Sequence, residues 1–148
     1  MYEEEEVKEM KNIMCVEFIN NSENESFARM VATAFVTPLN PTLEEIVEIK
    51  TAISEAVTNA IIHGYENTVG MVRMEGKISG NKIEYTISDR GCGIPDIEKA
   101  REPLYTGKPE LERSGMGFSI MESFMDSIEV SSSVGMGTTV KLTKVIGK

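Results

Sequence analysis

The order of the helices and strands expected along the chain is the feature that most restricts its fold. Two stretches of alternating apolar residues follow each other across Gly80-Asn81, and two more follow each other across Gly135-Met136-Gly137. Short glycine turns of this kind join antiparallel strands, whereas a doubly wound parallel sheet needs helices and strands in strict alternation. The sequence therefore predicts an α+β fold, a two-layer sandwich whose mixed, mostly antiparallel sheet carries helices on one face. The strands are expected at residues 13–19, 69–79, 82–88, 128–133 and 138–145, and three of the helices at residues 42–63, 96–101 and 116–125.

A further helix is expected between Ser22 and Pro38. Residues 22–25 have the Ser-x-x-Glu spacing of a capping box, and Pro38 ends the helix because proline cannot continue it. Its buried face is predicted from the apolar residues spaced three and four apart: Phe27, Met30, Val31, Ala34 and Phe35.

The second helix has a capping box at Thr42 and Glu45, and it is expected to run to His63 and end at Gly64. A helix turns by about 100° per residue, so its apolar residues can be placed around Val57. The predicted core stripe consists of Leu43, Ile46, Ile53, Val57 and Ile61.

Polar residues occupy the other side of this helix. Glu55 and Asn59 fall at about 160° and 200° from Val57, with His63 one turn further, among small neighbours that let another group approach. Each of them singly is more often part of a solvated polar face. An amide oxygen is nevertheless a suitable Mg²⁺ ligand, and a glutamate can act as a general base. His63 alone is better explained by a hydrogen bond near the helix end.

Three glycine turns follow the second helix. Asp89-x-Gly91-x-Gly93 comes after an expected strand, where Asp89 could accept a hydrogen bond from the exocyclic amine of adenine; alone it is an ordinary Asp/Gly turn. Gly115-Met116-Gly117 opens a helix whose unpaired N–H groups favour a phosphate chain, although it matches neither the Walker nor the Rossmann pattern. Gly135-x-Gly137-Thr138-Thr139 adds hydroxyls to what would otherwise be a hairpin loop.

Length and charge restrict the class of protein. The chain has 148 residues and a net charge of −9 at pH 7, which suits one domain with its own core and disfavours binding to nucleic acid. No apolar run approaches the roughly 20 residues of a membrane span, and the acidic start does not resemble a secretory signal. Cys15 and Cys92 form no paired metal motif. We expect a cytoplasmic protein with a flexible arm at residues 1–11 and a single domain at residues 12–148.

The motifs occur in a defined order: Glu-x₃-Asn-x₃-His on a helix, Asp-x-Gly-x-Gly, Gly-x-Gly at a helix start, and Gly-Thr-Thr on the last hairpin. The set resembles the four ATP-binding boxes of the GHKL superfamily, which includes gyrase and the histidine kinases, over about residues 12–146. Residues 54–65 and 108–118 are most similar to the anti-sigma-F factors of sporulating bacilli and clostridia, as is Asn24-Glu-Ser-Phe-Ala-Arg29.

The resemblance implies a role for each matching residue. Glu55 would be the catalytic base for a serine hydroxyl, and Asn59 would ligate Mg²⁺. Arg113 would act near the γ-phosphate, on a lid formed by residues 102–114. The residues implied in binding the nucleotide are Asn59, His63, Asp89, Gly91, Gly93, Ser114, Gly115, Met116, Gly117, Phe118, Thr138 and Thr139, with Thr139 assisting Asp89 at the adenine.

The resemblance further implies a homodimer that holds the sporulation sigma factor sigma-F inactive. It would use Mg-ATP to phosphorylate a serine of an anti-anti-sigma protein, releasing ADP, and Arg29 would lie on the surface that binds both partners. Two alternatives remain open: a related serine kinase of the general stress response, and a sequestering module whose ATP is only structural. Glu55 favours a kinase, and residues 108–118 favour the sporulation branch.

Overall fold

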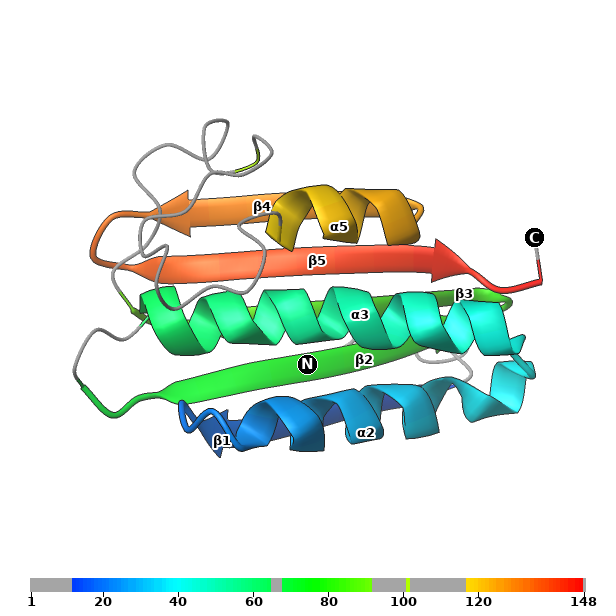
Figure 1. The fold of residues 1–148 in the computed structure, drawn as a ribbon, viewed down its shortest axis with the longest axis horizontal. Coiled ribbons are helices and arrows are strands. Elements are labelled where there is room, and N and C mark those ends of the chain that lie inside the picture. The colour runs from blue at the N-terminus through cyan, green and yellow to red at the C-terminus, as the bar shows by residue number, and fades with distance from the viewer. Residues whose placement is uncertain (1–11, 65–67, 92–100, 102–116, 148) are drawn as a thin grey trace, which may run out of the picture.

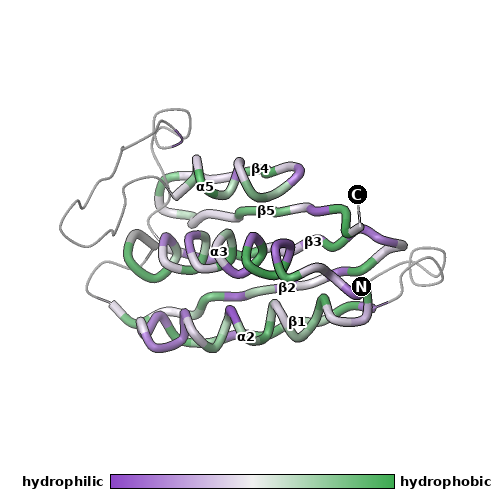
Figure 2. The backbone as a smooth tube through the Cα atoms, turned by 45° about the vertical axis from the view of Figure 1, so that its right-hand side comes forward, coloured by the Kyte–Doolittle hydropathy of each residue, from purple (hydrophilic) through white to green (hydrophobic). Residues whose placement is uncertain are grey.

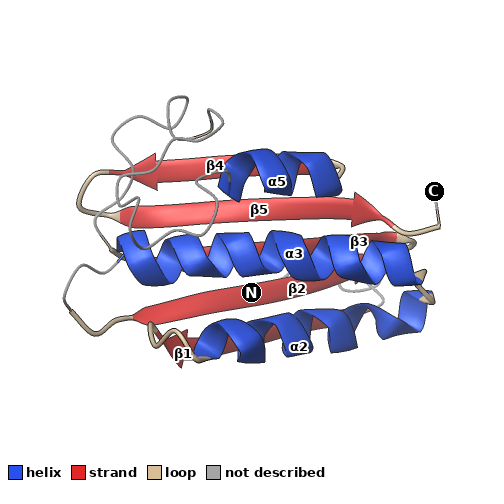
Figure 3. Cartoon of the chain, viewed as in Figure 1, coloured by secondary structure: helices blue, strands red, loops and turns tan. Residues whose placement is uncertain are grey.

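The computed structural model describes residues 12–64, 68–91, 101 and 117–147. In these ranges five strands form one sheet in the order β1-β2-β3-β5-β4, and every neighbouring pair is antiparallel. Helices cover one face of the sheet, as Figures 1 and 3 show. The predicted two-layer α+β sandwich is confirmed. Its elements are β1 (Asn12–Ile19), α2 (Asn24–Val36), η1 (Thr37–Leu39), α3 (Leu43–Asn59), η2 (Ala60–Gly64), β2 (Met71–Ser79), β3 (Lys82–Asp89), α5 (Gly117–Phe124), β4 (Ser127–Ser133) and β5 (Gly137–Val145).

Both predicted hairpins are present. β2 and β3 join at Gly80, whose φ of +61° belongs to the left-handed region that glycine adopts without strain. β4 and β5 join through a turn in which the Met136 N–H donates to the Ser133 carbonyl at 2.9 Å. The arm expected at residues 1–11 and the helix expected at 96–101, apart from Arg101, lie outside the described residues.

α2 begins without the capping box that its sequence predicted. Glu23 is the N-cap residue, and among the described residues no side chain bonds the first turn as a cap. The carbonyl of Asn21 instead accepts a hydrogen bond from the Asn24 N–H at 2.9 Å. The capping prediction was wrong because the Glu25 carboxylate, which the box would have used, bonds to side chains of α3.

The buried side of α2 also differs from the prediction. Its fully buried residues are Ala28, Ala32 and Val36. These small side chains bring α2 so close to the sheet that the Tyr85 hydroxyl donates to the Ala32 carbonyl at 2.6 Å. The positions of the large apolar residues therefore did not predict which side of α2 packs against the sheet. Of the five predicted core residues, Val31 and Phe35 are partly buried against the core, whereas Phe27, Met30 and Ala34 are exposed.

α3 follows its prediction more closely. The capping box forms as expected: Thr42 Oγ1 accepts from the Glu45 N–H at 3.1 Å, and Glu45 Oε1 accepts from the Thr42 N–H at 2.9 Å. The helical path continues to Gly64, although its last turn widens to the π-helical η2. Figure 2 shows apolar and polar residues alternating along it, as expected for a helix with one buried side.

The core stripe of α3 was predicted only in part. Ile53 and Val57 are buried as expected, but Leu43 is 83% exposed. An angle around a helix indicates a side and does not show whether a neighbouring element reaches that far along the axis, and Leu43 occupies the first turn. Ile46 and Ile61 are partly buried, and the full buried set is Ile49, Ala52, Ile53, Ala56 and Val57.

The other face of the sheet carries ion pairs. Arg73 contacts Glu17 at 3.4 Å and Glu75 at 3.0 Å, and Lys141 contacts Glu84 at 3.0 Å. An antiparallel sheet with one solvated face alternates apolar and polar residues in this way. The functional residues therefore have to be sought on the helical face or at the ends of the strands.

Candidate functional site

The first residue of α5 meets the polar side of α3. A methyl group added at Gly117 would lie 3.2 Å from Glu55 Oε2 and 3.3 Å from Asn59 Nδ2, so the two helices touch here with no side chain between them. Glu55 and Asn59 are both partly buried. The prediction that they stand together on the side of α3 away from Val57 is confirmed, and the structure adds that this side faces the start of α5 (Figure 1).

This contact lies at Gly117, the first described residue of α5. The first N–H groups of a helix have no partner within it, and the helix dipole favours an anion beside them. The Phe118 side chain is 6% exposed and belongs to the core, so Phe118 can offer a ligand only its backbone. The predicted site residues Gly93, Arg113, Ser114, Gly115 and Met116 lie outside the described residues, as does the expected lid at 102–114.

The chain widens into the π-helical turn η2 directly after Asn59. π-Helical turns are rare and occur often at functional sites. η2 contacts both β3 and β5. The end of α3 therefore lies beside the C-terminal end of β3 and the N-terminal end of β5. The side chain of His63, within η2, is not among those described.

Asp89 is the last residue of β3 and is only 8% exposed. Burial raises the pKa of its carboxyl, and hydrogen bonds from the backbone of Gly91 and Thr138 offset part of that rise. The Gly91 N–H donates to Asp89 Oδ1 at 2.8 Å, which holds the carboxylate in place. A buried, oriented acceptor at a strand end is suited to binding a ligand N–H group.

Gly137 packs directly against the backbone of Asp89. Its φ is +100°, and an added methyl group would lie 2.1 Å from the Asp89 carbonyl oxygen. Residues opposite each other in an antiparallel pair share a face of the sheet. Thr138 pairs with Asp89, whereas Thr139 pairs with Ser88. The prediction that Thr139 assists Asp89 is thus corrected: Thr138 shares the face of Asp89, and Thr139 lies on the opposite face because successive side chains along a strand alternate.

Two clusters at the margins of this site were not predicted. On α2, Glu25 accepts hydrogen bonds from Ser54 and Thr58 of α3 and pairs with Arg29. The only signal in the sequence was the spacing of Ser54 and Thr58, four residues apart.

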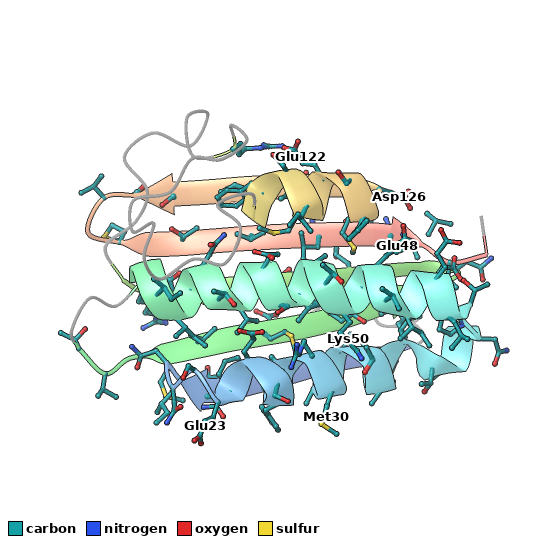
Figure 4. All side chains as sticks on the ribbon, viewed as in Figure 1. Glu23, Met30, Glu48, Lys50, Glu122 and Asp126 are labelled. Atoms are coloured by element: carbon teal, nitrogen blue, oxygen red, sulfur yellow. The ribbon has the colours of Figure 1, made fainter. Side chains whose placement is uncertain are left out.

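The second cluster surrounds Lys144, which is 8% exposed. Its Nζ donates to the Phe124 carbonyl at the end of α5 at 2.7 Å and lies 3.3 Å from Glu48 Oε1. Figure 4 shows Glu48 and Lys50 leaving α3 on opposite sides, Glu48 towards α5 and Lys50 towards α2. Lys144 thus anchors the far end of the helix whose start lies at Glu55 and Asn59. Nothing in the sequence predicted these partners of Lys144.

The donor groups at α3 suit Mg²⁺ bound together with phosphate. Within the described ranges no group of three His, Cys, Asp or Glu side chains is placed to hold a metal by itself. Mg²⁺ usually takes one or two protein oxygens and fills its other positions with water and phosphate oxygens. The side-chain oxygen of Asn59, beside Gly117 and next to Glu55, fits that requirement.

A family model described as the histidine kinase-like ATPase domain matches residues 19–144. The chain belongs to this family. As a member it is an ATP-binding domain, in agreement with the anion-suited start of α5 and the buried acceptor Asp89. In the described part of the chain, no helix has the length and apolarity to cross a membrane.

Similar proteins narrow the assignment within this ATPase family. The anti-sigma F factor of a Thermoanaerobacter species is 56% identical over 139 residues, which cover 94% of this chain and 97% of that protein. The anti-sigma F factor of Bacillus licheniformis is 57% identical over 140 residues, covering 94% and 96%. The chain therefore also belongs to the anti-sigma F family. A structure of the RsbU and RsbW domains of a Mycobacterium tuberculosis protein shares the fold, with a TM-score of 0.66 at 18% identity, covering 92% of this chain and 32% of that one.

Proposed function

We propose that the protein is an anti-sigma F factor that holds sigma-F inactive and uses Mg-ATP to phosphorylate a serine of an anti-anti-sigma protein. It would act as a homodimer in the cytoplasm. The likeness to the anti-sigma F factors over nearly their whole length supports the proposal. The observation on the structure that carries it is the meeting of Glu55, Asn59 and Gly117 within contact distance.

In this proposal the nucleotide lies across the end of α3. Asp89 accepts a hydrogen bond from the adenine amine, with Thr138 beside it on the same face of the sheet. The phosphates lie at the start of α5, where backbone N–H groups stabilise their charge. The adenine thus binds where β3 ends and β5 begins, and the phosphates bind where α5 contacts α3.

Phosphoryl transfer needs positioning and charge stabilisation more than covalent participation by the protein. Asn59 would hold Mg²⁺ through its side-chain oxygen, and the bound ion supplies neutralisation of phosphate charge. The serine oxygen forms a bond to the γ-phosphorus while the bond from this phosphorus to ADP breaks. Glu55 accepts the proton that the serine hydroxyl loses. Because Glu55 and Asn59 lie one helical turn apart, the proposed base and the proposed metal ligand would both reach the same phosphate group.

Two arginines complete the proposal. Arg113 acts near the γ-phosphate, as its position in the matching motif suggests. Arg29 binds both protein partners from α2; its side chain is 32% exposed, and α2 flanks α3 on the side away from α5 (Figure 1). A partner could therefore contact Arg29 without entering the nucleotide site.

The test is incubation of the protein with γ-labelled ATP, Mg²⁺ and an anti-anti-sigma protein. We expect labelled phosphoserine in the partner and, in a separate binding assay, a complex with sigma-F. A protein that binds sigma-F but yields no phosphoserine would be a sequestering module whose ATP is structural, and the kinase half of the proposal would be rejected.

A further inference from the structure

Glu25 joins α2 to the helix that carries the proposed base and metal ligand. Its Oε1 accepts a hydrogen bond from Ser54 Oγ at 2.6 Å, and its Oε2 accepts one from Thr58 Oγ1 at 2.8 Å. The Glu25 side chain is 13% exposed, and Arg29 Nη1 lies 3.7 Å from the same Oε1 that Ser54 contacts. Hydrogen bonds to an ionised carboxylate are shorter and stronger than neutral ones. We call Glu25, Ser54 and Thr58 the α2–α3 clamp.

The clamp holds two points of α3 that lie one turn apart. Each hydroxyl residue immediately precedes a functional one: Ser54 precedes Glu55, and Thr58 precedes Asn59. Neighbouring residues on a helix differ by about 100°, so the clamp residues face α2 while Glu55 and Asn59 face α5. A rigid helix fixes these directions relative to each other. Whatever sets the rotation of α3 against α2 therefore also sets where Glu55 and Asn59 point.

Small rotations of α3 are large at the ends of its side chains. At about 6 Å from the helix axis, a rotation of about 10° moves a side-chain atom by about 1 Å, and misplacement on that scale can cost about 100-fold in rate. Packing along the buried stripe opposes such a rotation sterically, but apolar contacts have no directional preference of their own. One carboxylate that accepts from two hydroxyls on successive turns supplies the missing directional restraint.

We propose that Glu25 is a positioning residue that, through Ser54 and Thr58, sets the rotation of α3 and thereby the placement of Glu55 and Asn59. The inference rests on the proposed function for its catalytic consequence. It also links the nucleotide side of α3 to the surface that carries Arg29, because Arg29 and Ser54 share one oxygen of Glu25.

The test compares Thr58→Val, which removes the hydroxyl and keeps the branched shape, with Thr58→Ser, which keeps the hydroxyl. Thr51→Val is the matched control: the Thr51 hydroxyl lies on the same helix but bonds the Val47 carbonyl, outside the clamp. We expect kcat for serine phosphorylation to fall about 10-fold in Thr58→Val with little change in the KM for ATP. Thr58→Ser is expected to restore most of the rate, and Thr51→Val to leave it unchanged. Thermal unfolding of all variants separates this effect from a loss of folded protein.

A second measurement does not depend on any protein substrate. In ¹⁵N-labelled protein the side-chain amide resonances of Asn59 should shift in Thr58→Val and Glu25→Gln, and stay near their wild-type positions in Thr51→Val. Wild-type levels of kcat in Thr58→Val, or unshifted Asn59 resonances, would overturn the positioning role. A wild-type protein that phosphorylates no serine while the Asn59 resonances still respond to Thr58→Val would reject the kinase function and leave the clamp supported.

Discussion

The glycine at position 117 determines how closely α5 can approach the polar side of α3. Any side chain there would begin 3.2 Å from a carboxylate oxygen of Glu55 and 3.3 Å from the amide nitrogen of Asn59. This close approach places Glu55 and Asn59 directly beside the described start of α5, where the phosphates are proposed to bind. At the scale of the residue, Glu55 and Asn59 lie close to the backbone of α5 because Gly117 has no side chain.

Asn59→Ala tests the proposed metal ligand. Removing the amide oxygen takes away a protein ligand for Mg²⁺ without adding bulk near Gly117. We expect ATP affinity to become nearly independent of Mg²⁺, measured by calorimetric titration with and without the ion. The same Mg²⁺ dependence as in the wild type would rule Asn59 out as a ligand.

Asp89→Asn tests how much the buried, ionised carboxylate of Asp89 lowers the free energy of unfolding. Burial raises the pKa of Asp89 in the folded protein above its ordinary value, so the folded state holds this proton more tightly than the unfolded chain. The wild type therefore loses stability as pH rises through that window. Relative to the wild type, Asp89→Asn is expected to be more stable at pH 7, with an advantage that shrinks as the pH falls through the pKa of Asp89.

Urea denaturation of both proteins across that pH range measures the difference. Asp89→Asn should also bind ATP more weakly, because the proposed acceptor for the adenine amine loses its charge. A stability difference that does not vary with pH would contradict the assigned cause.

At the scale of the element, the β3 and β5 strands meet at a point where only glycine fits. Gly137→Ala would combine left-handed backbone strain with a contact of 2.1 Å to the Asp89 carbonyl oxygen. Gly135→Ala shares the positive φ, at +81°, but meets nothing within 4 Å. We expect Gly135→Ala to cost about 1 kcal/mol and Gly137→Ala at least about 2 kcal/mol more, because overpacking adds to the strain. Equal midpoints of urea unfolding would contradict this explanation.

The anchoring of α5 by Lys144 gives a second prediction about an element. Lys144→Met removes the hydrogen bond to Phe124 and leaves Glu48 without this partner, so we expect a loss of about 1–3 kcal/mol in the free energy of unfolding. Lys141→Met is the control, since the Lys141 ion pairs lie on the solvated face and are expected to contribute about 0–1 kcal/mol. Unfolding in urea measures both. A loss for Lys144→Met no larger than for Lys141→Met would show that the buried contacts do not anchor α5.

The sequence predicted the elements better than it predicted their contacts. Strand alternation, the glycine turns of the two hairpins and the Thr42 capping box are local features, and the structure confirms them. The side on which α2 is buried depends on how closely its alanines let it approach Tyr85, which no local pattern contains. Glu25 similarly matched a local capping box and was used instead for a tertiary contact.

In the candidate site, too, local features could be predicted and tertiary contacts could not. Glu55 and Asn59 could be predicted because helical periodicity put two polar residues where burial did not explain them. Which of Thr138 and Thr139 lies beside Asp89 could not be predicted, because a shift of one residue in register reverses the face on which a side chain lies. Lys144 could not be predicted either, since its role depends on the end of a helix distant in sequence.

At the scale of the whole molecule, α3 lies between two neighbours with different tasks. On one side the α2–α3 clamp ties it to the helix carrying Arg29, and on the other Glu55 and Asn59 meet the start of α5. The opposite face of the sheet carries the ion pairs of Arg73 and Lys141. In the described part of the chain, one layer of helices thus brings together the proposed partner surface and the proposed phosphate site.

The most direct test of the account is phosphotransfer by Glu55→Gln, which keeps the shape of the side chain and removes the base. With γ-labelled ATP, Mg²⁺ and the anti-anti-sigma protein, we expect ATP affinity close to that of the wild type and a rate of phosphoserine formation lower by about 10²–10⁴-fold. A variant that binds ATP and still forms phosphoserine at the wild-type rate would contradict the central claim that Glu55, held beside Asn59 and Gly117, is the base of a serine kinase.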